Sequence, residues 1–245
     1  MKTFEVVAHY RLRHDVAVVR LVGEFLYFEP GQSVSVRVPQ HPQLQRRLSP
    51  ALPPSLDGKM EFHVHAVPAG WVSGTIVTRT QPGDLWELGE PAGTMHVDDS
   101  GRDVIMVAGG TGLAPFRSII LDLARRPEPP QVYLFVGGRS PRDLYADDML
   151  VLLADELPWL TIVPVVDTME MPRWRDDWYN QTRIDISFDP DEILLGTLAD
   201  VVGDYGAFTN HQVLVCGSPA MTRATVDRLV SAGTPTAAIQ YDPIP

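Results

Sequence analysis

The sequence predicts a two-domain fold in which a small antiparallel β-barrel precedes a parallel α/β sheet. The first hundred residues hold short segments rich in β-branched and aromatic residues between Gly, Pro and Asp turns, a pattern typical of antiparallel strands. The remaining residues alternate apolar strands with amphipathic helices, which favours a parallel sheet with crossover helices. The pattern changes at the polar stretch 97–103, so we predict domains at 1–100 and 101–245.

Four segments of the N-terminal half have the composition of strands. In 60–68, MEFHVHAVP, apolar residues alternate with Glu61, His63 and His65, the period of a half-buried strand. We therefore expect the two histidines to point outward, and no spacing of His, Cys, Asp or Glu suggests a metal site. The other three predicted strands are 3–13, 16–23 and 25–39.

The C-terminal half contains alternating strands and helices in chain order. The predicted strands are 103–108, 131–138, 161–167 and 211–217, and the predicted helices are 114–126, 144–157 and 219–233. One segment fits neither class, because 167–193 combines prolines, charges and two tryptophans within five residues. We expect a long surface loop there, either a variable insertion or a lid or docking loop.

Composition excludes several classes of protein. The chain of 245 residues has a net charge of −11 and no basic stripe, which argues against a nucleic-acid partner. No apolar run is long enough to span a membrane, and the N-terminus lacks the apolar core of a signal peptide. The single cysteine cannot form an internal disulfide or hold an iron–sulfur cluster. A cytoplasmic location is the expectation.

A glycine-rich loop follows the first strand of the α/β half, in the stretch 104–117, VIMVAGGTGLAPFR. Gly109, Gly110 and Gly112 allow positive φ and close approach of the backbone, and Pro115 suits the first turn of a helix. A helix N-terminus at a strand end is a natural site for a pyrophosphate. Neither the dinucleotide fingerprint nor the P-loop pattern is met. The loop alone is therefore compatible with a phosphate site or with a tight structural turn.

Two later strand ends favour the phosphate site. Cys216 to Pro219 lie at the end of one strand and open a helix, and small residues there leave room for a flat ring. The alternative is a buried free cysteine at a turn. Gly137 to Ser140 end the second strand, where an adenosine ribose lies in such sheets.

These motifs, in this order, resemble the pyridine-nucleotide half of the ferredoxin–NADP reductase superfamily. The barrel carries matching flavin motifs: RRLS at 46–49 resembles the family's Arg-x-Tyr-Ser, GWVS at 70–73 its Gly-x-x-Ser/Thr phosphate turn, and PAG at 91–93 its Pro-x-Gly turn. The likeness is greatest to the reductase portion of flavohaemoglobins and of multicomponent oxygenase reductases. It implies a six-stranded barrel for FAD and a parallel sheet for NADH or NADPH.

The resemblance also implies roles for single residues. Arg46 would bind the FAD pyrophosphate through its fork of donors. Ser49 would hydrogen-bond near flavin N5, and Ser49 and Cys216 would line the site of hydride transfer. The positions assigned to cofactor binding are Arg46, Leu48, Ser49, His65, Val67, Gly70, Trp71, Val72, Ser73, Gly110, Thr111, Gly112, Pro115, Arg139, Asp143, Cys216, Gly217, Pro219, Tyr241 and Ile244.

The sequence departs from the family pattern at both flavin faces. Leu48 replaces the stacking tyrosine, and the chain end offers Tyr241 and Ile244 where a terminal aromatic is usual. Aliphatic side chains cover a ring without the aromatic stacking energy, about 0.5–1.5 kcal/mol per pair. The turn with Arg139 and Asp143 resembles that of NADH-using relatives, so NADH is favoured over NADPH.

These observations predict a stand-alone FAD-dependent NAD(P)H oxidoreductase that passes electrons to a separate acceptor, such as an oxygenase, a haem protein or an iron–sulfur protein. The alternative is a non-catalytic flavin- or nucleotide-binding subunit of a larger redox complex, suggested by Leu48 and Ile244. A further alternative is a nucleotide-binding protein without flavin.

Overall fold

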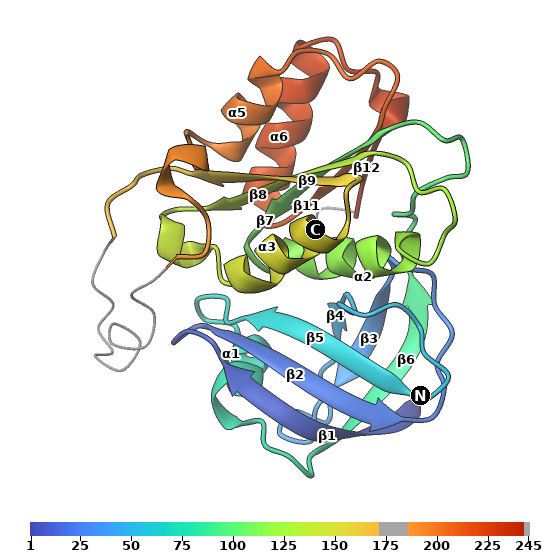
Figure 1. The fold of residues 1–245 in the computed structure, drawn as a ribbon. Helices are drawn as coiled ribbons and strands as arrows, with labels where there is room; N and C mark the ends of the chain where they lie inside the picture. Colours follow the sequence, from blue (N-terminus) through green and yellow to red (C-terminus); the bar gives the residue numbers. More distant parts are fainter. Residues whose placement is uncertain (172–185, 243–245) are drawn as a thin grey trace. The chain divides into compact units, whose positions relative to one another are not determined.

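The computed structural model describes residues 1–171 and 186–242. Its contacts divide the chain into two compact units, which Figure 1 draws along the colour scale of the sequence. The first unit comprises 1–96 together with 114–125, and the second comprises 97–113 and the residues from 126 onward. The division at residue 100 stays a prediction.

The first unit is a six-stranded antiparallel sheet. Its strands are β1 (Lys2–Arg11), β2 (Val16–Gly23), β3 (Ser33–Arg37), β4 (Arg46–Leu48), β5 (Lys59–His65) and β6 (Leu85–Ala92). They follow the order β4-β3-β6-β1-β2-β5, and every neighbouring pair is antiparallel. An isolated antiparallel bridge joins Pro50, just after β4, to Phe62 of β5, so the two edge strands meet. The predicted barrel is confirmed.

The barrel interior is filled by apolar side chains from alternate positions of its strands. Trp86 and Phe62 are fully buried, and their rings stack with centroids 6.2 Å apart. Leu48 of β4 packs against the same core while remaining partly exposed. Outside this core, Arg46 of β4 and His65 at the end of β5 are exposed, and the predicted flavin motifs lie in or next to these strands.

Helix α1 (Trp71–Arg79) was not predicted, because the sequence WVSGTIVTR is rich in β-branched residues and glycine. The helix forms because Val72, Ile76 and Val77 fall on one face and are buried in the barrel core. Packing of this face outweighs the weak local helix propensity.

Two other expectations for the barrel were wrong. The predicted strand 25–39 is a strand only over Ser33–Arg37, because Gly31 turns the chain with φ +102°. On β5, Glu61 and His63 do not point to solvent but are buried, with 3% and 8% of their surface exposed. Both faces of this strand are therefore covered in its middle, and only its two end residues, Lys59 and His65, are exposed.

The second unit contains a parallel six-stranded sheet. Its strands are β7 (Val104–Gly109), β8 (Val132–Gly138), β9 (Leu160–Val166), β10 (Leu194–Leu195), β11 (Gln212–Cys216) and β12 (Ile239–Tyr241), in the order β10-β9-β8-β7-β11-β12. All neighbours are parallel, which confirms the predicted α/β sheet. The strand order reverses between β7 and β11, the position where open α/β sheets bind ligands.

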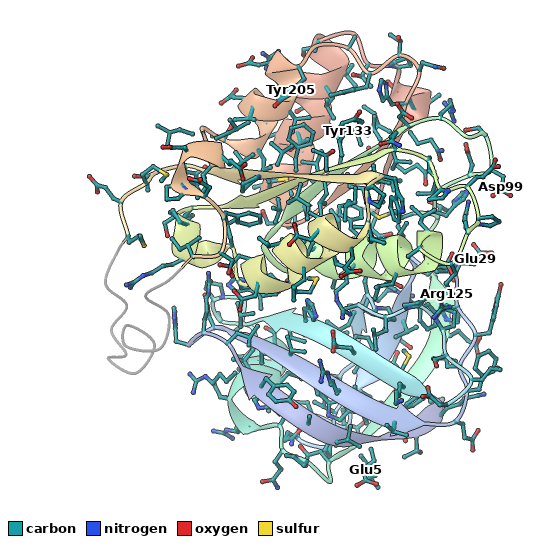
Figure 2. The ribbon with its side chains drawn as sticks, in the orientation of Figure 1. Glu5, Glu29, Asp99, Arg125, Tyr133 and Tyr205 are labelled. Atoms are coloured by element: carbon teal, nitrogen blue, oxygen red, sulfur yellow. The ribbon has the colours of Figure 1, made fainter. Side chains whose placement is uncertain are left out.

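Helices connect the strands of the parallel sheet. They are α2 (Leu113–Leu123), α3 (Asp147–Glu156), α5 (Leu198–Asp204) and α6 (Pro219–Ser231), with short 3-10 turns η1 (Gly110–Gly112), η2 (Pro141–Asp143), η3 (Pro190–Glu192) and η4 (Thr236–Ala238). Figure 1 shows α5 and α6 on one face of the sheet and α3 on the other. Tyr205, labelled in Figure 2, meets Phe135 of β8 edge-on with ring centroids 5.2 Å apart, closing the α5 side of this core.

Within the predicted loop 167–193, residues 172–185 lie outside the described residues. Its first part is bonded to the end of β8, since the amides of Asp167 and Thr168 donate to the carbonyls of Gly138 and Arg139. Its last part contains Ser187, whose amide donates to the buried carboxylate of Asp147 at 2.9 Å. The described flanks are therefore fixed to β8 and α3.

The packing of α1 makes a testable prediction. Ile76→Ala removes a side chain that is 1% exposed and is expected to lower the free energy of unfolding by about 2–5 kcal/mol. Urea unfolding followed by tryptophan fluorescence measures this. Leu56→Ala, at a side chain 88% exposed, is the control and is expected to change it by less than about 0.5 kcal/mol. Equal effects of the two substitutions would contradict the packing role of α1.

Candidate functional site

Most of the predicted nucleotide-binding residues lie at the carboxyl ends of three neighbouring strands. Gly109 of β7 pairs with Gly137 of β8, and Ala108 of β7 pairs with Cys216 of β11. Residues that follow these positions in the chain therefore emerge side by side at one edge of the sheet, at its switch point. The structure brings Gly110, Thr111, Gly112, Cys216 and Gly217 together there, with Arg139 at the adjacent strand end.

Gly110 and Gly112 of the loop have different structural roles. Gly110 is exposed, has φ +52°, and a Cβ there would meet nothing within 4 Å. Gly112 is buried, and a Cβ there would collide with the carbonyl of Cys216. Gly112 thus lets η1 approach β11, whereas Gly110 leaves open space where a ligand can approach the backbone.

The strand end at β11 is equally close-packed. A Cβ on Gly217 would collide with Met221 and would lie 3.3 Å from the backbone of Gly109. Ser218 caps α6 by accepting a hydrogen bond from the amide of Met221, and the exposed Pro219 begins the helix. Packing between β7 and β11 therefore requires a small residue at Gly217.

Cys216 is a free cysteine that is partly exposed as a residue. Burial of its sulfur, with a smaller effect of the Asp242 charge, raises the pKa of the thiol to about 12. The thiol is therefore neutral at physiological pH and cannot serve as a thiolate nucleophile or base. A small neutral group at this position suits contact with an uncharged ring.

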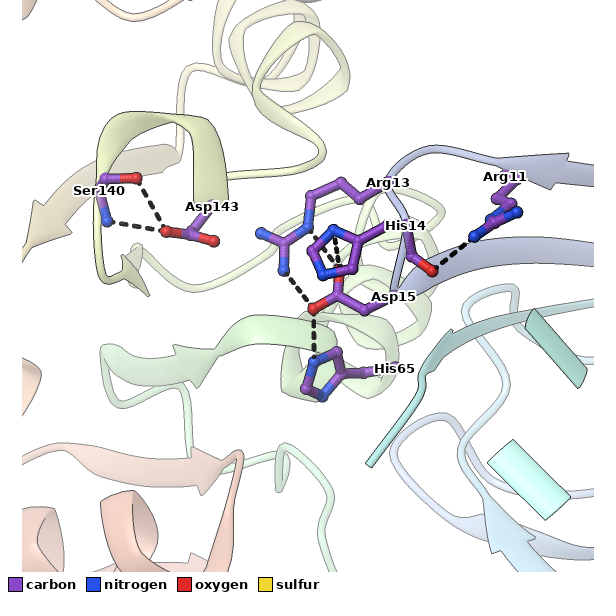
Figure 3. Close-up of polar contacts among 7 residues, drawn as sticks. All are labelled: Arg11, Arg13, His14, Asp15, His65, Ser140 and Asp143. Atoms are coloured by element: carbon purple, nitrogen blue, oxygen red, sulfur yellow. Dashed lines mark hydrogen bonds and ion pairs between the residues drawn. The ribbon is translucent and has the colours of Figure 1, made fainter. Parts of the chain in front are cut away.

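The turn after β8 holds the predicted ribose residues. Asp143 accepts hydrogen bonds from the amide and hydroxyl of Ser140, at 3.0 and 2.9 Å, which Figure 3 draws. This carboxylate therefore shapes its own turn, while Arg139 is exposed beside it. Tyr241 ends β12 next to β11 and is 37% exposed.

Of two further predicted positions, one is buried and the other lies outside the described residues. Pro115 lies in the first turn of α2 and is buried. Ile244 lies outside the described residues.

In the first unit, the motif RRLS forms β4 and the residue after it. Arg46 is exposed, and its guanidinium donates to the neighbouring carbonyl of Gln45 at 2.7 Å. Arg47 instead donates to the hydroxyl and the carbonyl of Ser33, so the two arginines have separate roles. Ser49 is half-buried just before the bridge that joins this segment to β5.

The predicted phosphate turn is the N-terminus of α1. Gly70 occupies the cap position without a capping side chain, so the first amides of the helix have no side-chain acceptor from the cap. Ala69 precedes it with φ +61°, a strained conformation for a residue other than glycine. The hydroxyl of Ser73 accepts from the amide of Val67 at 3.1 Å, which closes the turn. The backbone N–H groups at the start of α1, more than the Ser73 hydroxyl, are therefore available to bind an anion.

The side chains around this helix end are apolar. Trp71 and Val67 are 75% and 58% exposed, whereas Val72 is 1% exposed and belongs to the barrel core. Exposed apolar side chains next to free amides form a surface suited to a ligand with both a charged group and a flat apolar part.

His65, at the end of β5, is held by a charged cluster (Figure 3). Its Nε2 lies 3.1 Å from Asp15, which also accepts two hydrogen bonds from Arg13 at 3.0 and 3.1 Å. Burial opposes the ionisation of Asp15, but the hydrogen bonds from His65 and Arg13 outweigh it and keep the pKa of Asp15 well below its ordinary value. The orientation of His65 is therefore fixed from the β1–β2 turn.

The residues present fit a flavin dinucleotide and a nicotinamide dinucleotide. An exposed arginine and an uncapped helix N-terminus suit a pyrophosphate in the first unit, and an open positive-φ glycine at a switch point suits a second one in the other. In residues 1–171 and 186–242, no group of three or more His, Cys, Asp or Glu is arranged to hold a metal ion. In the same residues, no helix has the length and apolar character needed to cross a membrane.

Sequence reasoning missed two features of the site. Arg117, directly after the glycine loop motif, is the first: its guanidinium donates to the carbonyl of Ala51, two residues after Ser49. Its position beside the buried Phe116 on an amphipathic helix was the available indication. The second is the strain at Ala69, which a proline-containing turn does not by itself reveal.

Comparison with family models identifies both units. Residues 3–97 match the oxidoreductase FAD-binding domain, and residues 106–227 match the oxidoreductase NAD-binding domain. The ferredoxin reductase in carbazole 1,9a-dioxygenase has the same fold, with a TM-score of 0.80 and 26% identity over 99% of this chain and 69% of that chain. The chain belongs to the ferredoxin–NADP reductase superfamily, with an FAD-binding domain followed by an NAD-binding domain.

Individual relatives share this arrangement. The electron transfer component of xylene/toluene monooxygenase from Pseudomonas putida is 28% identical over 91% of this chain and 59% of that protein. The reductase component of phenol 2-monooxygenase from Pseudomonas sp. (strain CF600) is 31% identical over 83% of this chain and 54% of that protein. The chain thus spans little more than half the length of these relatives.

The open space at Gly110 predicts a specific effect on coenzyme binding. Gly110→Ala adds a methyl group on the exposed loop at φ +52°, and we expect the dissociation constant for NADH to rise at least about tenfold. Gly101→Ala is the matched control, because Gly101 has φ +71° and equally open surroundings. Both substitutions should cost about 1–2 kcal/mol of stability from backbone strain. Calorimetric titration with NADH distinguishes them; equal affinities would refute a coenzyme site at Gly110.

The raised pKa of Cys216 predicts slow alkylation. Burial raises the thiol pKa to about 12 in the folded chain, from an ordinary value of 9.0. Iodoacetamide at pH 8 should therefore react about 1,000-fold more slowly with the folded chain than with the urea-unfolded chain. The folded rate should still rise at pH 10, where the unfolded rate has levelled off. Because the unfolded thiol ionises first, this group's contribution to stability is complete below pH 9 and declines above it. Comparable rates in both states would contradict the burial of the thiol.

Proposed function

We propose that the chain is an FAD-dependent NAD(P)H oxidoreductase that passes electrons from a nicotinamide coenzyme through flavin to a separate acceptor protein. The observation that carries the proposal is that each of the two matched domains has an arrangement suited to an anion. One is the uncapped N-terminus of α1 with exposed Arg46 on β4, and the other is the open loop at Gly110. We take the domains as 1–100 and 101–245.

On the flavin side, the chain binds and orients. Arg46 and the first amides of α1 neutralise the pyrophosphate, and Leu48 covers one face of the ring. Ser49 donates or accepts a hydrogen bond near N5. His65, Val67 and Trp71 are exposed at the end of β5 and the start of α1, whereas the Val72 side chain is buried and leaves only its backbone to face a ligand. FAD, when bound, supplies a hydride acceptor that can release electrons singly or in pairs.

On the nicotinamide side, the chain mainly provides space and a helix terminus. Gly110, Thr111 and Gly112 approach the phosphates, and Cys216 with Gly217 leaves room for the nicotinamide ring. Burial raises the pKa of the Cys216 thiol, so the neutral thiol would line the nicotinamide position without exchanging a proton. Ser49 and Cys216 are the two residues we assign to the transfer site.

We propose NADH as the preferred coenzyme and an oxygenase, a haem protein or an iron–sulfur protein as acceptor. The relatives support this class of partner, since they are electron transfer and reductase components of monooxygenases. Arg139 and Asp143 border the ribose position, and the arrangement of this turn is like that of NADH-using relatives. A cytoplasmic location is part of the proposal and accords with the free cysteine.

An anaerobic titration tests the proposal. Protein reconstituted with FAD is titrated with NADH and separately with NADPH while flavin absorbance is recorded. Bleaching by NADH at lower concentration than by NADPH is the expected result. Bound flavin that neither coenzyme reduces would favour the non-catalytic subunit, which the replacement at Leu48 makes the second candidate. Protein that takes up no FAD would overturn both.

Leu48 carries a prediction on flavin affinity. Leu48→Tyr supplies the missing aromatic stack, worth about 0.5–1.5 kcal/mol, so the dissociation constant for FAD should fall about 2- to 12-fold. Quenching of flavin fluorescence measures it. Leu48→Met conserves volume and should leave the constant within about twofold. A weaker or unchanged affinity of the folded tyrosine variant would place the ring away from Leu48.

A further inference from the structure

A buried carboxylate in the first unit binds three basic side chains. Glu61 of β5 is 3% exposed, and its Oε2 accepts from Arg20 Nε at 2.7 Å. Its Oε1 lies 3.0 Å from Arg117 Nη1 and 3.1 Å from His63 Nε2. Burial alone would raise the pKa of Glu61, but His63, Arg117 and Arg20 together hold it at about 2. The carboxylate is therefore ionised at every pH at which the protein is used.

Arg117 also contacts the chain segment that follows β4. The same Nη1 donates to the carbonyl of Ala51 at 2.8 Å, and the Arg117 side chain is 16% exposed. The amide of Ala51 in turn donates to the carbonyl of Glu61 at 2.8 Å. Ala51 is thus fixed through both of its peptide groups, to the strand that carries Glu61 and to helix α2.

The segment fixed in this way contains the proposed flavin contact. Pro50 bridges to Phe62, so Ser49 is the last residue before a stretch that is held by β5 and by Arg117. Arg117 also lies two residues after Pro115 on α2, the helix that continues from the glycine loop. One guanidinium therefore links the helix of the nucleotide motif to the chain segment of Ser49.

Arg20 provides an internal comparison for this contact. It binds the same carboxylate from β2, but its side chain is 52% exposed and lies over the ring of Tyr10, 5.3 Å from the centroid. Its removal takes one ionic partner from Glu61 and leaves the bond between Arg117 and Ala51 in place. Comparing removal of Arg20 with removal of Arg117 therefore distinguishes stabilisation of the buried charge from positioning of Ala51.

We propose that Arg117 is a positioning residue that holds Ser49, through Ala51, in the geometry required for hydride transfer to the flavin; this inference rests on the proposed function. Arg117 acts by a fixed hydrogen bond supported by the buried charge of Glu61, and it touches no reacting atom. Transfer rates depend steeply on such geometry, since a displacement of about 1 Å can cost about 100-fold.

The test compares Arg117→Met with Arg20→Met in the FAD-loaded protein. In anaerobic stopped-flow experiments with NADH, Arg117→Met should lower the limiting rate of flavin reduction at least about tenfold, with the half-saturating NADH concentration within about twofold. Arg20→Met should keep the limiting rate within about twofold. Arg117→Lys restores a cationic donor for the Ala51 carbonyl and should recover most of the rate.

Amide hydrogen exchange supplies a readout that does not depend on catalysis. The peptide that contains Ser49 and Ala51 should exchange faster in Arg117→Met than in Arg20→Met and wild type. Equal rates and equal exchange in the two methionine variants would overturn the positioning role and leave Glu61 as a structural charge. If wild type binds FAD but neither coenzyme reduces it, the proposed function fails, and the exchange comparison still decides whether Arg117 holds this segment.

Discussion

The parallel pairing of β7 with β8 on one side and β11 on the other is the constraint on which the nucleotide site depends. This pairing aligns three strand ends at one edge, so loops distant in sequence emerge together. The pairing is tight enough that Gly112 has no room for a Cβ against Cys216. Any larger residue there would separate η1 from β11 and open the switch point. Gly110, two residues earlier, is free of that constraint and is left to face a ligand.

Both proposed phosphate sites use the backbone more than side chains. The amides at the start of α1 and the open glycine before α2 provide donors whose positions are set by helix geometry, so they need no side-chain ordering when an anion arrives. The hydrogen bond between Val67 and Ser73 maintains the first of these turns against the strain at Ala69. The proposed pyrophosphate site therefore does not depend on an aromatic residue at position 48.

The first unit tolerates an ionised group in its interior because the group is fully partnered. An unpaired carboxylate at the position of Glu61 would be strongly destabilising, and its three basic neighbours offset that cost. A hydrophobic side chain could fill the same space, yet it would lose the connection between β5, α2 and the carbonyl of Ala51. The cluster therefore fixes how β5, α2 and Ala51 are arranged, in addition to contributing to stability.

The sequence by itself determined the class of both domains, the strand ends that bear the glycines, and the order of the cofactor motifs. These follow from local periodicity and from residue types that a turn or a phosphate demands. Tertiary structure decided the rest. Helix α1 forms in spite of its composition because Ile76 and Val77 are buried, and β10, α5 and β12 are too short for their periodicity to be recognised. The alternation in β5 predicted solvent at Glu61 and His63, but a pattern of period two records only that two faces differ. Such a pattern does not distinguish a polar side chain exposed to water from a buried charge with ionic partners. The partners of Glu61, Arg20 and Arg117, lie 41 and 56 positions away in the chain and meet it only in the folded unit.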